Sequence, residues 1–440
     1  MGKYFGTDGI RGKAKVTLTD ETVYRVGKFV GNYYKDARIV IGMDTRISSK
    51  DFEEDLCKGM KESGAKVYLL GYCSTPCLAY TTMNEKFSCG VMISASHNPY
   101  TDNGIKIFAN DGFKINEEIE SKIEAYIDDP QGIEAVNTGE IIDYKQAIKT
   151  YQDWLLNSYQ LDLKGKKVLV DLCNGSNCYT AKDVLDKLNG EFSYINDEPN
   201  GTNINNNCGS THLDMLKEKV KEGDYEMGFA FDGDADRVLF VDEDGETVDG
   251  DKIMYLLSKY LKDNGLLNGN TLVTTVMSNI GLYKALEKID VKSDITAVGD
   301  KNVSDSMQKN GFVVGGEQSG HIIYSNDCYF GDGLKTALLV MKALNYYGMT
   351  LKESVREVKI YPQLLINEHV KDKKVVLNDE VINDKIKQIA DTLGNNGRIL
   401  VRPSGTEPLI RVMVEAENDE LCHSYVYEVI DLIKERGYAA

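Results

Sequence analysis

Short apolar runs that alternate with amphipathic stretches are the feature that most constrains the fold of this chain. The apolar runs include residues 38–42, 66–70, 90–94, 167–171, 227–231 and 271–276. Such an alternation is typical of α/β domains, in which buried strands alternate with helices. Four strands run into polar loops, at residues 95–99, 232–237, 316–321 and 402–408. Because ligands of α/β sheets bind beyond the carboxyl ends of strands, we expect these loops to build one composite site.

The length of 440 residues exceeds what one core normally holds, since domains run to about 100–200 residues. We expect α/β domains at residues 1–152, 153–250 and 251–360, and a smaller C-terminal domain at 361–440. The expected helices are residues 51–63, 144–159, 181–187 and 334–346. Further strands are expected at residues 294–298, 312–315 and 409–415. The smaller domain is expected to begin near residues 360–366 and to contain residues 398–401.

Charge and cysteine content exclude several classes of protein. The net charge of −18 argues against a nucleic-acid binder, which needs a basic surface, but leaves room for a local cationic pocket. The chain has no apolar run of membrane-spanning length, and its first residues lack the apolar core of a signal peptide. Its nine cysteines form no CxxC pair, so we expect reduced thiols in a cytoplasmic protein.

Asp232, Asp234 and Asp236 alternate with small residues. In an extended backbone their carboxylates would share one face and repel one another, and a divalent cation such as Mg²⁺ would remove that repulsion. The plain alternative is an acidic solvated turn. An EF-hand loop is a second alternative, but Arg237 stands where that loop needs glycine. Arg237 beside a metal would suit a phosphate clamp.

Ser96 follows a buried strand and precedes His97, Asn98 and Pro99. Taken alone, a serine before Asn-Pro is a turn residue more often than a nucleophile. The chain lacks G-x-S-x-G, Walker A and G-x-G-x-x-G sequences, so neither a hydrolase elbow nor nucleotide-dependent transfer is favoured. Lys106 is either a surface strand lysine or, in a closed cleft, a proton carrier.

Three further loops carry groups that suit a sugar phosphate. Residues 402–406 combine a guanidinium, two hydroxyls and a glycine backbone, the donors that a phosphate dianion needs. Glu317 could bind sugar hydroxyls, and His321 could donate a hydrogen bond or carry a proton. Residues 6–12 form another glycine-rich loop with a cation, Arg11. Each loop could equally be a plain polar turn.

As a set and in this order, these segments resemble the motifs of the α-D-phosphohexomutase family. The segments are GTDGIRG at 6–12, SASHNP at 94–99, DGDADR at 232–237, GEQSGH at 316–321 and RPSGTEP at 402–408. The resemblance spans essentially the whole chain. It implies three related α/β domains with mixed sheets and a small α+β C-terminal domain of TATA-box-binding-protein-like topology, arranged around a central cleft.

The resemblance also implies roles for individual residues. Ser96 would carry the phosphoryl group, and one Mg²⁺ per chain would be held by the Ser96 phosphate and the three aspartates. The implied general acid/base groups and their supports are Lys106, His321, Arg11 and His97. The implied substrate ligands are Arg237, Lys301, Glu317, Ser319, Arg402, Ser404, Gly405 and Thr406. Lys301 stands in GDKNV where GDRYV is usual, so it keeps the charge but loses the planar fork.

Within the family, residues 316–321 and 402–415 look most like the phosphoglucosamine mutase branch, which interconverts glucosamine 6-phosphate and glucosamine 1-phosphate through a bisphosphate. Phosphomannomutase/phosphoglucomutase members, the alternative, tend to carry Met where Gln318 stands. The resemblance further implies a hexose 1,6-bisphosphate activator and a homodimer, with no nucleic-acid or membrane partner. A non-catalytic phosphosugar sensor is the alternative from another class, and the intact Ser96, aspartates and Lys106 argue against it.

Overall fold

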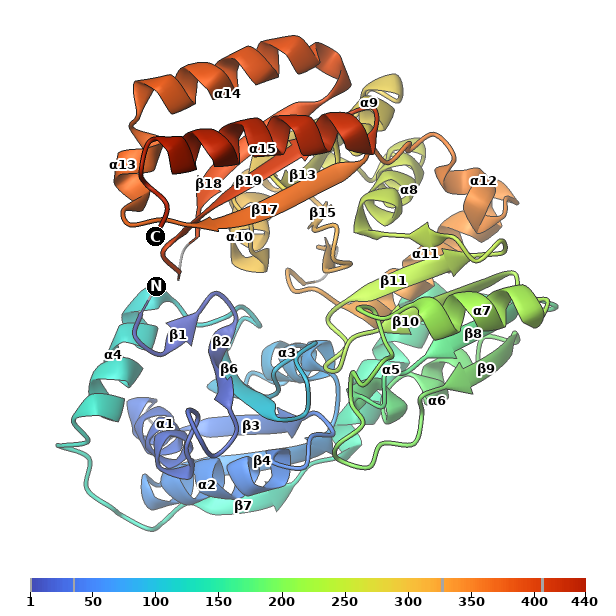
Figure 1. Ribbon diagram of the computed structural model, residues 1–440. Helices are drawn as coiled ribbons and strands as arrows, with labels where there is room; N and C mark the ends of the chain where they lie inside the picture. Colours follow the sequence, from blue (N-terminus) through green and yellow to red (C-terminus); the bar gives the residue numbers. More distant parts are fainter. Residues whose placement is uncertain (1, 35, 326–327, 405–406) are drawn as a thin grey trace. The chain divides into compact units, whose positions relative to one another are not determined.

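The computed structural model describes residues 2–34, 36–325, 328–404 and 407–440 (Figure 1). Contacts divide the chain into two compact units. The larger comprises Met1–Met277 and Asp290–Arg356, and the smaller comprises Ser278–Ile289 and Glu357–Ala440. The larger unit holds three sheets and the smaller unit holds one.

The first sheet has the strand order β1-β2-β6-β5-β3-β4-β7. These strands are β1 (Phe5–Gly6), β2 (Gly9–Lys13), β3 (Arg38–Met43), β4 (Lys66–Tyr72), β5 (Cys89–Ile93), β6 (Asp102–Ala109) and β7 (Glu140–Asp143). The sheet is mixed, because β3 pairs in parallel with β4 and β5 whereas β6 runs antiparallel to β5 and β2. The antiparallel β6 carries Lys106 next to the strand that leads to Ser96.

Three helices share a core with one face of this sheet: α1 (Asp20–Tyr33), α2 (Ser49–Glu62) and α4 (Glu117–Asp128). Val23, Val26 and Val30 of α1 are buried, as their helical spacing predicts. Helices α1 and α2 meet closely at two glycines, and a Cβ on Gly27 or on Gly59 would lie 2.4 Å from a backbone oxygen of the other helix. Helix α3 (Thr75–Asn84) also packs on β3 and β5 and is almost wholly buried.

The second sheet has the order β12-β11-β10-β8-β9. Its strands are β8 (Lys167–Asp171), β9 (Glu191–Ile195), β10 (Met227–Phe231), β11 (Val238–Asp242) and β12 (Thr247–Val248). The associated helices are α5 (Gln146–Tyr159), α6 (Lys182–Leu185), α7 (Asp214–Glu222) and a 3₁₀ turn at Ser176–Cys178. Helix α7 buries Leu216 and Val220 against the sheet.

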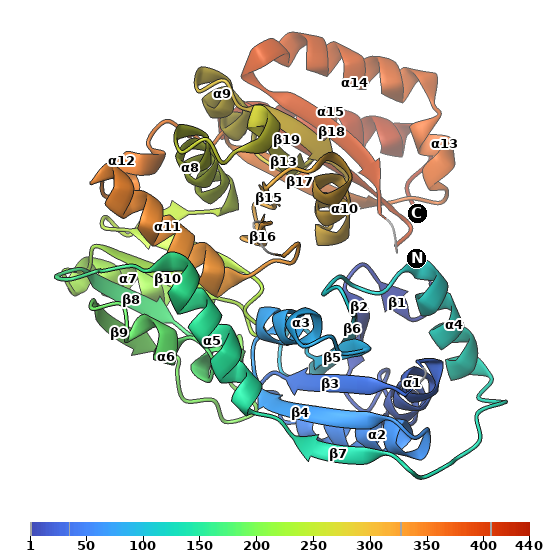
Figure 2. The same ribbon diagram turned by 180° about the vertical axis from the view of Figure 1, so that it is seen from behind.

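The third sheet has the order β14-β13-β15-β16. Its strands are β13 (Thr271–Thr275), β14 (Lys292–Thr296), β15 (Val314–Gly316) and β16 (Ile322–Tyr324). The helices that belong with it are α8 (Gly250–Asp263), α10 (Asp300–Asn310), α11 (Gly333–Tyr347) and α12 (Leu351–Val355), together with a 3₁₀ turn at Asn268–Asn270. Figure 2 shows α5 and α11, from the second and third sequence regions, lying side by side, and the two helices are in contact.

The smaller unit has one antiparallel sheet, in the order β17-β19-β18. Its strands are β17 (Gln363–His369), β18 (Arg398–Pro403) and β19 (Leu409–Glu415). Its helices are α9 (Ile280–Lys288), α13 (Lys373–Leu377), α14 (Glu380–Leu393) and α15 (Asp419–Glu435), with a 3₁₀ turn at Gly394–Asn396. Helices α14 and α15 share a core with the sheet.

The expected fold class, mixed α/β sheets followed by a small α+β unit, is confirmed. Some expected boundaries were wrong. The strand expected at residues 294–298 is Lys292–Thr296, and the helix expected at 181–187 is one turn, Lys182–Leu185. The strand expected at 312–315 starts at Val314, because left-handed Gly311 ends α10 and the next residues complete its cap. Within the described residues, no helix has the length and apolarity to cross a membrane.

Candidate active site

Loops at the ends of strands bring the predicted site residues of the larger unit together. Ser96 lies just beyond β5, the aspartates lie between β10 and β11, and residues 317–321 join β15 to β16. An isolated bridge pairs Arg237 with His321, so the second and third of these loops are directly hydrogen-bonded. The expectation of a composite site at strand ends therefore holds for these loops.

Ser96 is fully buried, and its side chain points at the acidic loop. Its Oγ donates a hydrogen bond of 2.6 Å to Oδ2 of Asp232 and lies 3.3 Å from Nδ1 of His97. The backbone of Ser96 is left-handed, with φ at 53°. That conformation costs a residue other than glycine roughly 1–3 kcal/mol and is held by its surroundings. The constrained turn therefore directs the Ser96 side chain toward Asp232.

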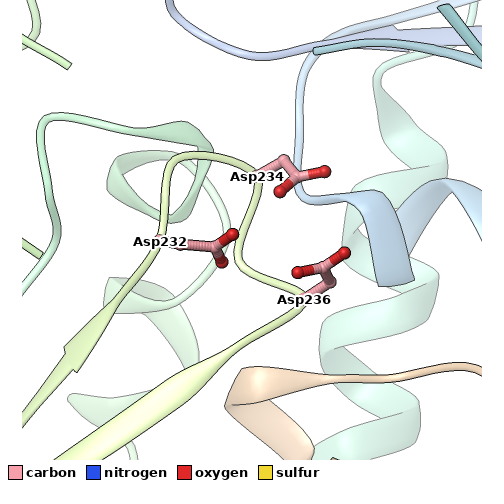
Figure 3. Close-up of side chains that lie close together, drawn as sticks. All are labelled: Asp232, Asp234 and Asp236. Atoms are coloured by element: carbon pink, nitrogen blue, oxygen red, sulfur yellow. The ribbon is translucent and has the colours of Figure 1, made fainter. Parts of the chain in front are cut away.

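The carboxylates of Asp232, Asp234 and Asp236 converge (Figure 3), with one oxygen from each lying within 4.8 Å of the others. The extended backbone that we inferred for this loop is wrong: residues 232–236 form a turn with left-handed Ala235. A turn, and not a strand, therefore brings the three side chains together. All three residues are buried, which excludes the solvated acidic turn.

Lys106 lies inside a ring of carboxylates. Its Nζ is 2.7 Å from Asp234, 3.0 Å from Asp8 and 3.3 Å from Asp236. The residue is 1% exposed, so the alternative of a surface lysine is wrong. Burial opposes its charge, but Asp234, Asp8 and Asp236 outweigh burial and hold the pKa of Lys106 well above its ordinary value. Lys106 is therefore protonated at neutral pH in this arrangement.

The acidic cluster has the donors and the charge for a divalent cation. Burial and the neighbouring carboxylates of Asp236 and Asp234 raise the pKa of Asp232 well above its usual range. The pKa of Asp236 is held low despite burial, because Lys106, His321 and Arg237 favour its charged form. Oδ1 of Asp234 and Oδ1 of Asp236 are buried and have no hydrogen-bond partner within the described residues. Converging buried carboxylates that keep oxygens free of hydrogen bonds fit Mg²⁺.

The surroundings of the two histidines of the site shift their pKa values in opposite directions. Burial, together with Arg237 and Arg11, lowers the pKa of His97 to about 4, so His97 is neutral at pH 7. For His321 burial also disfavours the charge, but Asp236 and Asp300 outweigh it and raise the pKa. Nδ1 of His321 is 3.7 Å from Asp236, and its Nε2 is 3.9 Å from Asp300.

Two arginines of the site have unused donors. Nε of Arg11 and Nε of Arg237 are buried, and neither makes a hydrogen bond to a described residue. Arg11 pairs through another nitrogen with Asp8, and the backbone N of Arg237 donates to Oδ1 of Asp232. Nε of Arg237 lies 3.8 Å from Oδ1 of Asp236, an ion pair without a hydrogen bond. Buried guanidinium N–H groups that make no hydrogen bond are suited to an anionic ligand.

The loop that we expected to contact sugar is partly exposed. Oε1 of Glu317 accepts a hydrogen bond from Gly299 N, and Ser319 Oγ donates to its Oε2 at 3.4 Å. Gln318 donates to Asp249, which caps helix α8. Lys301 lies in the first turn of α10 and lines the same 60 Å³ cavity as Lys106 and His321.

Sequence reasoning missed four members of the cluster. Lys114 bridges Asp8 and Asp300, and it is 2.6 Å from Asp300. Thr75 donates a 2.5 Å hydrogen bond to Oδ2 of Asp234. Asp8 lies in a loop already singled out for Arg11, so its charge was a usable signal. Asp300 lies in the GDKNV segment already singled out for Lys301, whereas Lys114 and Thr75 come from separate regions with no motif to mark them.

The smaller unit carries a separate basic pair. Arg402 of β18 lies opposite Arg411 of β19, and Nε of Arg411 is buried without a hydrogen-bond partner among the described residues. Burial and Arg411 lower the pKa of Arg402. Ser404 is buried beside them at the end of β18, and Gly405 and Thr406 lie outside the described residues. Like charges directly across a sheet destabilise it, and the Nε of Arg411 is a donor available to an anion.

Family models match the chain from end to end. They are those of phosphoglucomutase/phosphomannomutase, matching alpha/beta/alpha domain I at residues 2–132, domain II at 143–245, domain III at 249–361 and the C-terminal domain at 365–432. The chain belongs to the phosphoglucomutase/phosphomannomutase family. Membership of this family confirms the resemblance to phosphohexomutases.

Relatives of this family member include proteins named phosphoglucosamine mutase. That of Lachnospira eligens is 47% identical over 449 residues, covering 100% of both chains. That of Lachnoclostridium phytofermentans is 48% identical over 445 residues, covering 100% of this chain and 99% of the relative.

Solved structures of the family share the fold. A phosphoglucomutase/phosphomannomutase family protein from Burkholderia thailandensis superposes with a TM-score of 0.81 at 22% identity, covering 98% of this chain and 97% of that one. The N-acetylphosphoglucosamine mutase of Aspergillus fumigatus, solved with GlcNAc-6P and magnesium, gives a TM-score of 0.71 at 19% identity, covering 99% and 96%. At these identities the likeness concerns the fold.

Proposed function

We propose that the chain is a phosphohexomutase that interconverts glucosamine 6-phosphate and glucosamine 1-phosphate through a phosphoserine at Ser96 and a sugar bisphosphate. The observation that carries this proposal is the 2.6 Å hydrogen bond from Ser96 to Asp232, inside a buried acidic cluster. The full-length similarity to proteins named phosphoglucosamine mutase supports the choice of sugar.

Ser96 would give its phosphoryl group to one hydroxyl of the bound sugar phosphate and take the other phosphoryl group back. In each transfer one P–O bond breaks as another forms, and the attacking hydroxyl loses a proton. Lys106 and His321 are the proposed proton carriers, because both are buried and both face Asp236. Lys106 is charged in this arrangement, which suits it to protonate the departing oxygen.

The remaining residues of the cluster would hold the reacting phosphate. The hydroxyl proton of Ser96 points at Asp232, so neutral His97 is left to donate to Oγ from Nδ1. Arg11 and Arg237 would use their Nε groups, which make no hydrogen bond within the described residues, on phosphate oxygens. Asp232, Asp234 and Asp236, with the Ser96 phosphate, would hold Mg²⁺. The ion would supply positive charge to a transition state in which negative charge spreads over phosphoryl oxygens.

The substrate would be held at both ends. Glu317 and Ser319 are proposed to bind sugar hydroxyls and Lys301 the substrate's charge. Arg402, Ser404, Gly405 and Thr406 would bind the phosphate that is not reacting. Such a phosphate site would serve both orientations of the bisphosphate, because it recognises phosphate and not a particular carbon.

We also propose the four domains with the boundaries expected from sequence, residues 1–152, 153–250, 251–360 and 361–440. A cytoplasmic location is supported by the nine cysteines, all free thiols in the described residues. A homodimer stays a prediction.

Intact mass spectrometry tests the phosphoserine. Incubation with glucose 1,6-bisphosphate should add one phosphoryl group to the wild type and none to Ser96→Ala, whereas the exposed control Ser121→Ala should behave as wild type. Equal turnover by Ser96→Ala would contradict the mechanism. Comparing glucosamine, mannose and glucose 1-phosphates tests the sugar, and a preference for mannose or glucose would move the chain to the phosphomannomutase/phosphoglucomutase branch. No turnover of any hexose phosphate would favour a phosphosugar sensor.

A further inference from the structure

Arg46 is the largest fully buried side chain of the described residues, and neither the motifs nor the proposed chemistry uses it. It follows β3 and lies beneath the loop that carries Ser96. A buried arginine is costly unless each of its donors is paired, so its partners indicate why it is there.

The five N–H groups of the Arg46 guanidinium all have acceptors. Nε donates to Oδ2 of Asp44 at 2.8 Å. The other acceptors are backbone oxygens of the serine loop: Ser96 O at 2.9 Å, Asn98 O at 2.8 Å, Asp102 O at 3.1 Å and Pro99 O. One rigid, planar group therefore fixes four carbonyls between residues 96 and 102.

A second side chain donates hydrogen bonds to two of the same carbonyls. Nδ2 of Asn205 donates to Ser96 O at 2.8 Å and to Asn98 O at 2.9 Å. Asn205 lies between β9 and β10, in the sequence region that carries the acidic loop. A Cβ on Gly233 would lie 2.6 Å from Ser96 O, so the acidic loop itself is packed on this carbonyl.

The amide of Ser96 is fixed as well, through the same carboxylate that pairs with Arg46. Ser96 N donates to Ser94 Oγ at 2.9 Å, and Ser94 Oγ donates to Oδ2 of Asp44 at 2.6 Å. Both peptide groups flanking the left-handed Ser96 are thus held by one network. Asp44 neutralises the positive charge of Arg46, so the network affects Ser96 by fixing the position of its backbone and not by its charge.

We propose that Arg46 is a positioning residue that sets the direction of Ser96 Oγ toward Asp232 for phosphoryl transfer, and that Asn205 assists it. This inference rests on the proposed role of Ser96. Lysine cannot replace Arg46, because an ammonium offers three donors from one point and cannot reach four separated carbonyls. A nucleophile misplaced by about 1 Å can lose a hundredfold in rate, even where binding is intact.

The test is the rate at which Ser96 gains phosphate from glucose 1,6-bisphosphate in the full-length protein, followed by intact mass. For Arg46→Lys we expect a fall of about a hundredfold, with the KM for glucosamine 1-phosphate and the Mg²⁺-dependent thermal shift unchanged. Asn205→Ala should show a smaller fall of the same kind. Arg25→Lys is the matched control, because Arg25 also bonds a carboxylate and a backbone oxygen but lies away from the loop.

A purely structural role would lower the unfolding temperature of Arg46→Lys and leave the rate per folded molecule unchanged. That result overturns the proposal. If Arg46→Lys does not fold, Asn205→Ala decides, and transfer within threefold of wild type overturns the proposal. A wild type that gains no phosphate would instead refute the proposed function, and the positioning role with it.

Discussion

Ser96 Oγ and Asp232 Oδ2 lie 2.6 Å apart, although 136 residues separate them in the chain. This hydrogen bond links the serine loop of the first sheet to the acidic loop of the second. It also predicts how the site responds to a metal, because Asp232 is the carboxylate whose pKa is raised by burial and by Asp236 and Asp234.

Asp232→Asn removes a charge that burial, Asp236 and Asp234 disfavour, so we expect only a small change of its unfolding temperature in metal-free buffer. With Mg²⁺ at about 100 times its Kd, the wild type should gain about 2.7 kcal/mol, and Asp232→Asn should lose most of that gain. Thermal unfolding with and without Mg²⁺ measures both. The exposed control Asp263→Asn should keep the full response, and an equal response by Asp232→Asn would disprove the ligand assignment.

Lys106→Gln should lower kcat about 10²–10⁴-fold, because it removes a proposed proton carrier. Mg²⁺ should bind at least as tightly as in the wild type. In the wild type the Lys106 ammonium neutralises part of the charge of Asp234 and Asp236, and the variant lacks that ammonium. Steady-state kinetics and Mg²⁺ titration check the two effects. Lys28→Gln, at a half-buried ion pair with Glu62, is the control. Near-normal kcat in Lys106→Gln would remove Lys106 from the chemistry.

Arg411→Met tests the basic pair of the smaller unit. We expect KM for glucosamine 1-phosphate to rise about 10–100-fold, because one charge-assisted hydrogen bond is worth about 1.5–3 kcal/mol. Phosphorylation of Ser96 at saturating bisphosphate should be nearly unchanged. Steady-state kinetics and intact mass measure these effects, with the exposed Lys387→Met as control. An unchanged KM would show that Arg411 does not touch the substrate phosphate.

Arg398 and Glu415 form a two-point ion pair in the smaller unit. Nε and a terminal nitrogen of Arg398 donate to the fully buried Glu415 at 2.8 and 3.0 Å. Arg398→Met leaves this carboxylate without its cation, and we expect a loss of about 3–5 kcal/mol. Hydrogen exchange of peptides from β17 to β19 measures it. Lys385→Met, which breaks an exposed pair with Glu428, should cost about 1 kcal/mol or less, and equal losses would refute the argument.

Asp379 gives the smaller unit a dependence on pH. Its hydrogen bond from Tyr438 and its contact with Arg436 lower its pKa from 3.8 to about 2, against the effect of burial. A lowered pKa stabilises the fold above the unfolded value of about 3.8, and this contribution disappears as pH falls toward 2. Asp379→Asn should therefore unfold at a lower temperature than wild type at pH 7. The difference should narrow between about pH 4 and pH 2.

Thermal unfolding of both proteins across that range measures the narrowing. Asp391→Asn, on the exposed face of α14, should match the wild type throughout. A difference that is as large at pH 3 as at pH 7 would show that the charge of Asp379 is not the cause.

The sequence by itself determined the α/β class and pointed to most residues of the candidate site, because both produce local sequence patterns. Buried strands are short apolar runs, and groups that handle phosphate and metal are polar residues beside glycines at strand ends. Hence Ser96, Asp232 and Lys106 could be named in advance. The reason given for the aspartates was nevertheless wrong in detail, since a turn and not an extended strand makes them converge.

Tertiary structure alone decided which distant side chains share a charge environment. Lys106 looks like a strand lysine until Asp8 and Asp234 enclose it, and Lys114 carries no local signal at all. Arg46 is likewise an ordinary cation in the sequence. Its role follows from the five acceptors of its guanidinium, and four of these are backbone oxygens. Any residue type has a backbone oxygen, so these partners cannot be recognised from the sequence. Electrostatic and hydrogen-bonding partners are set by distance in space, whereas local sequence patterns report only on neighbours along the chain.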